Sequence, residues 1–173
     1  MASNMYICTI KFDMKTTVVL YLFLFIAFSS FSQLDEKGFT DGTIMELKDQ
    51  GITIVPPKGY KYKKSTPGFI SMSHQASIHL QRIENAAYFY TIASIEHTDY
   101  SKQPVKLLGK EEVEGGAIFT FQFKVQDKSV ERLVLVTGTK NSTVIISVNY
   151  EKGADSNTEK ELRDCLKSVA VLR

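Results

Sequence analysis

The sequence predicts an α+β domain in which helices flank a curved antiparallel β-sheet. Four segments rich in β-branched and aromatic residues follow one another between residues 105 and 150, and the connectors between them have the lengths of hairpin loops. Strands joined by such short connections must be antiparallel. An amphipathic segment follows, with apolar residues at Leu162, Cys165, Leu166 and Val169. This i, i+3, i+4, i+7 spacing predicts a helix that lies across the apolar face of the sheet.

The four hairpin-linked strands differ in how many of their faces are apolar. They are predicted at Val105–Val113, Ala117–Val125, Val130–Thr137 and Thr143–Tyr150. In the second strand Phe119, Phe121 and Phe123 share one face, because side chains alternate along a strand. In the third strand the apolar residues 133–136 are continuous, which predicts a central strand covered on both faces.

The first half of the domain is predicted to contain shorter strands separated by turns. Candidate strands are Gly51–Val55, a short edge strand at Tyr60–Lys64, Phe69–Ser73 and the alternating segment Ala76–Ile83. Proline and glycine residues punctuate the connections between them. Residues 84–98 combine strand composition with helical spacing, and we predict a loop that leads into a short helix.

The N-terminal region has the pattern of an export signal. Lys15 provides a basic start, Val18–Phe28 is an unbroken apolar run of eleven residues, and serines follow it. A membrane-spanning helix needs about 20 apolar residues, so cleavage is favoured over anchoring. We therefore predict an upstream extension at residues 1–13, a signal peptide at 14–33, a flexible lead-in at 34–43 and a single domain at 44–173. The mature protein is predicted to be periplasmic or secreted, without a membrane span.

Composition restricts the partners and the redox chemistry of the predicted mature chain. The whole sequence has a formal net charge of +2, a balance that does not suggest a nucleic-acid partner. Cys8 precedes the signal, so Cys165 is left without a partner for an internal disulfide. Its place on the apolar helix stripe predicts a buried, unreactive thiol.

The order of these elements resembles the PsbP-like superfamily. The features that carry the resemblance are Pro57-Lys-Gly-Tyr60 after an early strand, Gly68-Phe69 opening the next, residues 76–80, Gly109–Gly115 leading into the phenylalanine-rich strand, and Leu166–Val169 closing the terminal helix. The resemblance implies an αβα sandwich that serves mostly as a non-catalytic binding or assembly module. The matching positions lie in strands and turns, so the resemblance carries over no functional residue.

A search for catalytic motifs favours ordinary structural roles for the polar residues. The sequence holds no G-x-S-x-G, H-E-x-x-H or phosphate-binding loop motif. His79 is predicted on the solvated face of its strand, and His97 and Asp99 in a polar cluster at a helix end. The carboxylates at positions 111, 112 and 114 are predicted at a solvated sheet edge. No metal or cofactor is predicted.

The most suggestive surface elements are two clusters of aromatic residues. Lysines alternate with tyrosines between residues 58 and 64, a pattern suited to docking an anionic polymer or a partner, although edge lysines also prevent sheet aggregation. The second cluster, residues 88–90, suits either a pocket wall or an ordinary core. The candidate ligand-binding residues are Tyr60, Lys61, Tyr62, Lys63, Tyr88 and Tyr90.

The sequence therefore predicts an exported, non-enzymatic module that binds a protein or a small ligand in the cell envelope. Two alternatives stay open. One is a hydrolase or other enzyme whose site forms only in three dimensions, using His97, Asp99 or the glutamates 111–114. The other is an interaction module that recruits a partner chain by strand addition at a sheet edge.

Overall fold

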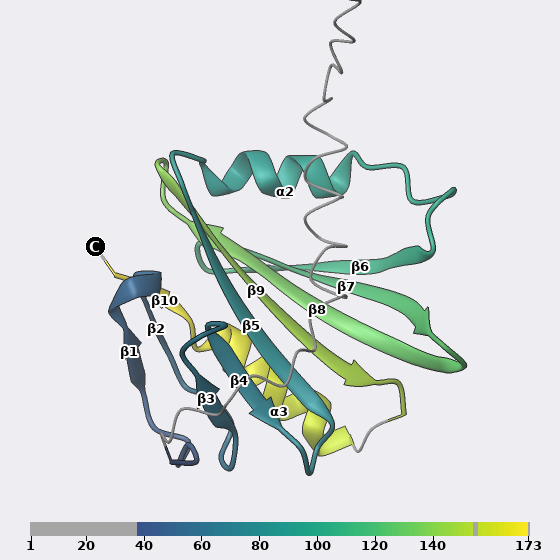
Figure 1. The fold of residues 1–173 in the computed structure, drawn as a ribbon. Helices are drawn as coiled ribbons and strands as arrows, with labels where there is room; N and C mark the ends of the chain where they lie inside the picture. The colour runs from purple at the N-terminus through teal and green to yellow at the C-terminus, as the bar shows by residue number, and fades with distance from the viewer. Residues whose placement is uncertain (1–37, 154–155, 173) are drawn as a thin grey trace, which may run out of the picture. The chain divides into compact units, whose positions relative to one another are not determined.

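The computed structural model describes residues 38–153 and 156–172. The predicted upstream extension and signal peptide, and residues 34–37 of the predicted lead-in, lie outside this range. The elements in chain order (Figure 1) are β1 (Met45–Leu47), the 3-10 turn η1 (Lys48–Gln50), β2 (Ile52–Ile54), β3 (Lys61–Lys63), β4 (Gly68–Ser71), β5 (Ala76–Glu84), α2 (Tyr88–Glu96), β6 (Val105–Val113), β7 (Gly116–Val125), β8 (Lys128–Gly138), β9 (Ser142–Glu151), α3 (Ser156–Lys167) and β10 (Ala170–Val171).

Seven of the strands form one antiparallel sheet in the order β3-β4-β5-β9-β8-β7-β6. The four hairpin-linked strands are confirmed within three residues of their predicted ends, and β8 is central as predicted. A second, three-stranded sheet has the order β1-β2-β10. The fold class is therefore α+β, as the sequence predicted.

One face of the large sheet, here called the α3 face, is sealed by helix α3 and the small sheet. Leu162, Cys165 and Leu166 of the predicted stripe are buried and pack with alternating residues of β4, β5, β7, β8 and β9 in one apolar cluster, against which Val169 is partly buried. Cys165 lies in this cluster, and burial raises the pKa of its thiol to about 12. The predicted buried, unreactive cysteine agrees with this environment.

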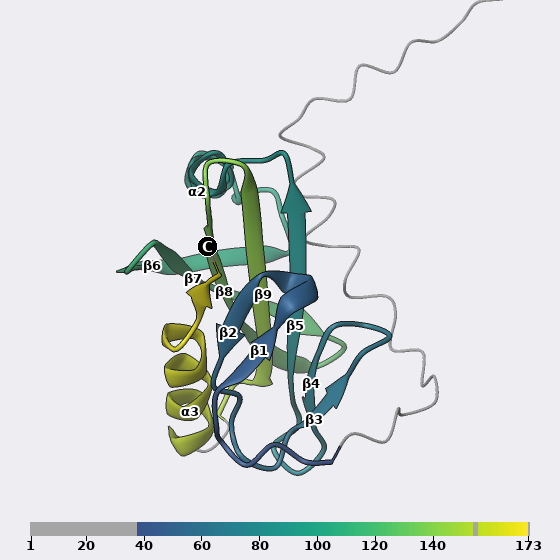
Figure 2. The ribbon, with the colours of Figure 1, turned by 90° about the vertical axis from the view of Figure 1, so that its left-hand side faces the viewer.

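The opposite face, here called the α2 face, carries helix α2 at one end. The helix packs over β7, β8 and β9, and its own residue Ile95 is buried. Figures 1 and 2 show α2 near the end where β8 turns into β9, and α3 near the opposite end of these strands. Phe119 and Phe121 lie on the α2 face, where Tyr100 contacts the Phe121 ring with centroids 5.7 Å apart.

Strand β10, like β1, was not predicted from the sequence. The helix was expected to continue to Val169 but ends at Lys167, because Ser168 interrupts it. The Ser168 hydroxyl donates to the Cys165 carbonyl at 2.6 Å and accepts from the Val55 backbone N–H at 2.9 Å. This pair of bonds directs the last residues alongside β2, where Ala170 pairs with Thr53.

The described part of the predicted lead-in, residues 38–43, contacts the sheet edge. Phe39 forms a β-bridge to Lys61 of β3, and the buried Thr40 forms hydrogen bonds with the backbone of Tyr60. Its N–H donates to the Tyr60 carbonyl at 2.7 Å, and its Oγ1 accepts from the Tyr60 N–H at 3.0 Å. These residues are therefore ordered by contacts that composition alone does not reveal.

The helices of residues 38–153 and 156–172 are too short or too polar to cross a bilayer.

Candidate functional site

The end of the α2 face away from helix α2 carries polar side chains on three neighbouring strands. Strand register places Arg132 of β8 directly opposite Asn149 of β9, and Asn149 directly opposite Ser77 of β5. His79 lies two residues along β5 and therefore points to the same face. We call Arg132, Asn149, Ser77 and His79 the polar row.

Hydrogen bonds connect the four residues of the polar row. The Arg132 Nε donates to Asn149 Oδ1 at 2.6 Å, and Asn149 Nδ2 donates to Ser77 Oγ at 3.4 Å. The Ser77 Oγ lies 3.2 Å from His79 Nε2. The guanidinium also lies 5.0 Å above the centre of the Phe123 ring, a cation–π contact. Burial lowers the pKa of Arg132 to about 10, so the group keeps its charge at neutral pH.

His79 is not the solvated surface histidine that strand alternation predicted. The side chain is half-buried, and its pKa is lowered, first by burial and then by the charges of Arg132 and Lys63. Its Nδ1 atom is buried and has no hydrogen-bond partner in the described part of the chain. The prediction was wrong because the neighbouring strands and their long side chains shield this face.

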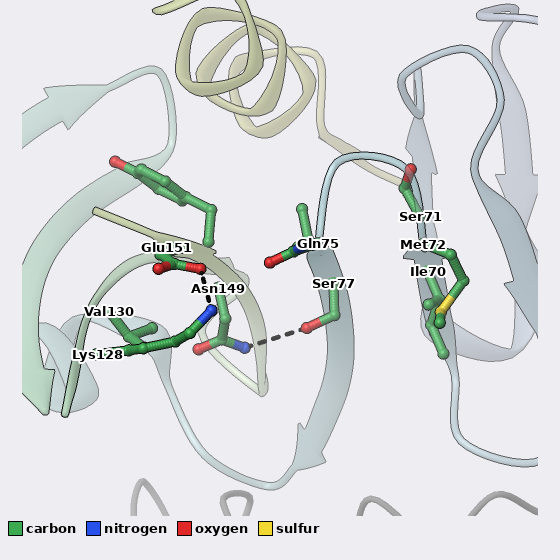
Figure 3. A pocket seen from close by; sticks show the side chains of 11 residues that line it. Ile70, Ser71, Met72, Gln75, Ser77, Lys128, Val130, Asn149 and Glu151 are labelled. Atoms are coloured by element: carbon green, nitrogen blue, oxygen red, sulfur yellow. Dashed lines mark hydrogen bonds and ion pairs between the residues drawn. The ribbon is translucent and has the colours of Figure 1, made fainter. Parts of the chain in front are cut away.

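A pocket of about 450 Å³ adjoins the polar row at the β4–β5 hairpin. Figure 3 shows Ser77 and Asn149 in its wall, joined by their hydrogen bond, and the Lys128–Glu151 ion pair beside them, with nitrogen and oxygen 2.8 Å apart. The apolar part of the lining comes from Ile70, Met72 and Val130. We call this space the hairpin pocket.

The basic-aromatic run lies partly in the core and partly beside the polar row. Tyr60 is 1% exposed, stacks on His74 at 5.9 Å between ring centroids, and has its pKa raised to about 12 by burial. Tyr62 is half-buried against Phe69 on the α3 face, with ring centroids 5.2 Å apart. The tyrosines therefore contribute to packing.

The two lysines of the run that belong to β3, Lys61 and Lys63, lie on the other face of this strand. Lys61 pairs with Ile70, and Lys63 pairs with Gly68, which in turn pairs with His79. Gly68 has no side chain to separate Lys63 from His79, and a Cβ there would lie 2.2 Å from the Ile78 carbonyl oxygen. The register thus brings Lys63 to the side of His79, and it places Lys61 on the same face, across Ile70 from Ser77.

Tyr88 and Tyr90 belong to helix α2 and lie away from β3, near the other end of the sheet (Figures 1 and 2). Tyr90 is 72% exposed, and its ring lies 4.6 Å from that of Phe89, while Tyr88 is half-buried. The six predicted residues therefore do not form one site.

The sequence interpretation missed Arg132, Asn149, Ser77 and the hairpin pocket. The available signal was the alternation in β5 and β9, where Ser77, His79, Ser147 and Asn149 occupy positions between buried apolar residues. Alternation gives each strand a polar face but does not align one strand with the next. That alignment depends on the register.

The structure shows local contacts for several residues of the enzymatic alternative. Glu111 pairs with Lys167 at 2.6 Å and with Arg163 at 3.7 Å, and Glu112 pairs with Lys110. Asp99 is exposed, and its pKa is lowered first by a hydrogen bond from the Ser101 side chain and then by the Ser101 N–H, which donates to it at 2.9 Å. Across residues 38–153 and 156–172, no three histidine, cysteine or carboxylate side chains gather as metal ligands would.

Strand β6 forms the long edge of the described sheet, which bears on the strand-addition alternative. It has nine residues, whereas the opposite edge strand β3 has three and is bridged by Phe39. A bulge interrupts the pairing of β6 between Leu107 and Gly109, and charged side chains follow it. Bulges and charges are devices by which natural sheets prevent edge-to-edge pairing.

Comparison with known proteins identifies similar folds. No family model matches the chain, and no curated protein matches it. A structure from Bacteroides thetaiotaomicron is similar over 71% of this chain, with 10% identity and a TM-score of 0.50. The match covers 46% of that protein, so this chain spans about half its length.

Two further structures are similar over most of their own length. The solution structure of cyanobacterial PsbP from Synechocystis sp. PCC 6803 matches 83% of this chain and 98% of its own, with 14% identity and a TM-score of 0.48. LpqN, a Mycobacterium tuberculosis protein involved in cell envelope biogenesis, matches 76% of this chain and 90% of its own, with 10% identity and a TM-score of 0.48. At these identities the likeness to these solved structures concerns the fold alone.

Proposed function

We propose that this chain is an exported, non-catalytic binding module whose small ligand occupies the hairpin pocket. The observation that carries the proposal is the convergence of Ser77, Asn149 and the Lys128–Glu151 pair from three strands onto one space with an apolar wall. Ligand sites in proteins are concave, have volumes of roughly 300–1,000 Å³ and combine apolar walls with a few placed polar groups. The hairpin pocket has these properties.

The electrostatics of the polar row favour binding over nucleophilic catalysis. Ser77 and His79 resemble a serine–base pair, since Ser77 Oγ and His79 Nε2 are 3.2 Å apart. A general base must accept the serine proton and become an imidazolium, and a third group usually stabilises that charge. Arg132 and Lys63 oppose the imidazolium charge, and both lower the pKa of His79. The pair is therefore poorly suited to activating a nucleophile.

The test is to fill the pocket without disturbing the core. Val130 lines the pocket and is half-buried, so Val130→Trp should occupy the ligand space, whereas Val125→Trp at an exposed position outside it is the matched control. We expect ligand-observed NMR of a small-molecule library to find compounds that bind the unaltered protein and the Val125→Trp variant but not Val130→Trp. Equal binding by all three proteins would contradict the proposed site.

Catalysis is tested separately with Ser77→Ala. Ester, phosphoester and glycoside substrates should show no turnover above that of buffer with either protein. Turnover by the unaltered chain that disappears in Ser77→Ala would overturn the non-catalytic assignment and support the enzymatic alternative.

Export rests on the pattern of residues 14–33, with its basic start, apolar run and serines. Expression of the full chain in a bacterial host should yield a processed protein in the periplasm or medium. N-terminal sequencing should place its first residue at or near Leu34. An unprocessed chain retained in the cytoplasm would contradict export and leave the pocket assignment intact.

A further inference from the structure

A second pocket, of about 350 Å³, adjoins the hairpin pocket. The two pockets share Gln75 and Glu151 in their linings, so they meet at the β4–β5 hairpin. Among the described residues, the lining of the second pocket consists of Gly153 and of residues with polar or charged side chains, which are Ser73, His74, Gln75, Glu151, Lys152 and Thr158. We call this space the polar pocket.

The apolar wall of the hairpin pocket is partly open to solvent. Met72 is 77% exposed although it is a large apolar residue, and Ile70 and Val130 are half-buried. Figure 3 shows Ile70 and Met72 on one side of this pocket and Val130 on the other. Methionine is flexible and adapts its shape to an apolar partner. The apolar part of a ligand would therefore bind here by removing these side chains from water.

Gln75 stands where the two pockets meet, in an uncommon backbone conformation. Its φ of 46° lies in the left-handed region, which glycine adopts without strain, and its side chain is exposed. Residues held in this region by the surrounding structure cluster at sites that clamp ligands. The glutamine amide can both donate and accept a hydrogen bond at the boundary between the apolar wall and the polar pocket.

His74 is held in place in the wall of the polar pocket. Its Nδ1 lies 2.8 Å from Ser71 Oγ, and its ring stacks on the buried Tyr60 with 5.9 Å between the ring centroids. The hairpin itself engages one ring nitrogen, so a ligand in the polar pocket would meet the other, Nε2. A few positioned hydrogen-bonding groups of this kind orient the ligand in protein binding sites.

The charged residues of the two pockets are paired within the chain. The Lys128 and Glu151 side chains are 2.8 Å apart, and Lys152 Nζ lies 3.7 Å from Glu131 Oε1. A charged ligand would compete with these pairs. A hydroxyl group both donates and accepts, so it can bond to neutral side chains such as those of His74, Gln75 and Thr158 and leave the pairs intact. The polar pocket therefore suits an uncharged, hydroxylated group.

We propose that the hairpin pocket and the polar pocket form one site for an elongated amphiphile. Its hydrocarbon part lies against Ile70, Met72 and Val130, and its uncharged, hydroxylated part lies beside His74 and Gln75. This inference rests on the proposed function and specifies its ligand class. A molecule with both parts binds more tightly than either part alone, because it loses its translational and rotational freedom only once.

The probes are hexyl glucoside, which has both parts, and 1-hexanol and methyl glucoside, which have one part each. Each is titrated into the full chain below micelle-forming concentrations. The NMR signals of the Met72 methyl group and the Gln75 side-chain amide are followed, because they report this site and not the apolar run of residues 18–28. Hexyl glucoside should shift both signals and bind at least about tenfold more tightly than either single-part probe. Butyl glucoside should bind about tenfold more weakly than hexyl glucoside, because each buried methylene group contributes about a factor of four.

Gln75→Gly tests the polar part of the site without straining the fold, because glycine readily adopts a φ of 46°. It should weaken the binding of hexyl glucoside about two- to tenfold, the size expected for one hydrogen bond, and leave that of 1-hexanol unchanged. Gln126→Gly is the matched control. It makes the same change at a φ of 54° in the β7–β8 turn, outside the linings of both pockets, and should leave both affinities unchanged.

Met72→Gln tests the apolar part at a position where the side chain is exposed and not needed for the core. It should weaken the binding of 1-hexanol and of hexyl glucoside and leave that of methyl glucoside unchanged. Lys152→Gln tests the charge of the ligand. It should leave the binding of hexyl glucoside unchanged, because the hydroxylated part is bound without an ion pair.

Three results would overturn the inference. One is hexyl glucoside that binds no more tightly than 1-hexanol. Another is equal weakening by Gln75→Gly and Gln126→Gly. The third is a charged probe, hexyl phosphate or hexylammonium, that binds more tightly than hexyl glucoside. If 1-hexanol or library compounds bind and Val130→Trp excludes them, the proposed function survives any of these results and only the ligand class is wrong. If no probe and no library compound binds, both proposals fail.

Discussion

The two faces of the same three strands, β5, β8 and β9, have opposite chemistry. On the α3 face the alternating side chains are apolar and buried; they include Ile78, Leu80, Leu133, Leu135, Ile146 and Val148. On the α2 face, one residue out of phase, the same strands present Ser77, His79, Arg132 and Asn149. Because both sets share one backbone, the difference between them lies in the side chains alone.

That difference separates stability from function. The α3 face already supplies a continuous core, so the polar residues of the α2 face are not needed to hold the sheet together. Burying polar groups costs free energy unless they are paired. The cost is large for an arginine with little exposed surface, such as Arg132. Apolar residues of similar size would fill a purely structural role with a smaller desolvation penalty.

The largest expected effect compares neighbours on β9 that point to opposite faces. Ile146→Ala should lower the free energy of unfolding by about 2–5 kcal/mol, because it leaves a cavity in the α3-face cluster. Ser147→Ala, at a half-buried position on the α2 face, should change it by less than about 1 kcal/mol. Urea denaturation measures both. Similar losses for the two variants would break the proposed division between the faces.

A second test probes the α3 face through its buried thiol. Cys165→Ser should destabilise the protein by about 1–3 kcal/mol, since it places a hydroxyl in an apolar site, and Cys165→Ala is the size control. The thiol should react with a disulfide reagent only after unfolding, because burial raises its pKa to about 12. Rapid labelling of the folded protein at neutral pH would show that helix α3 does not seal this face.

The α2 face should make stability depend on pH through His79. Its pKa is lowered in the folded state from an ordinary value of 6.5, so the unfolded chain binds a proton more readily. Stability should therefore fall as the pH drops through about 6.5 and stop falling below the folded pKa. In His79→Gln this part of the pH profile should flatten. An unchanged profile between pH 7.5 and 5.5 would show that the imidazole is not shielded.

The smallest effect is expected for the ion pairs that join β6 to α3. Glu111→Gln removes the partner of Lys167 and Arg163, all partly exposed, and should cost about 0.2–1 kcal/mol. The loss should shrink in 1 M salt, where charges are screened within about 3 Å. A loss above about 2 kcal/mol would mean that these charges, and not the apolar cluster, hold the α3 face closed.

Strands and helices were predictable where the pattern was long and local. The hairpin-linked strands and the Leu162–Val169 stripe followed from alternation and helical spacing, both properties of neighbouring residues. The short strand β10 and the contacts of Thr40 were not predictable in this way, because each depends on residues far away in the chain. The candidate site was the least predictable part. Lys63 was identified, but as part of a run whose tyrosines pack elsewhere.

By itself the sequence determined the fold class, the hairpin order, the buried cysteine and the polar character of one side of β5. Those features depend on periodicity, which the backbone imposes on every strand and helix. Only the tertiary structure decided that Arg132, Asn149, Ser77 and His79 stand in hydrogen-bond contact, since residues from three strands meet through register. A shift of one residue would turn each of these side chains to the other face, so no single strand contains the information that assembles them.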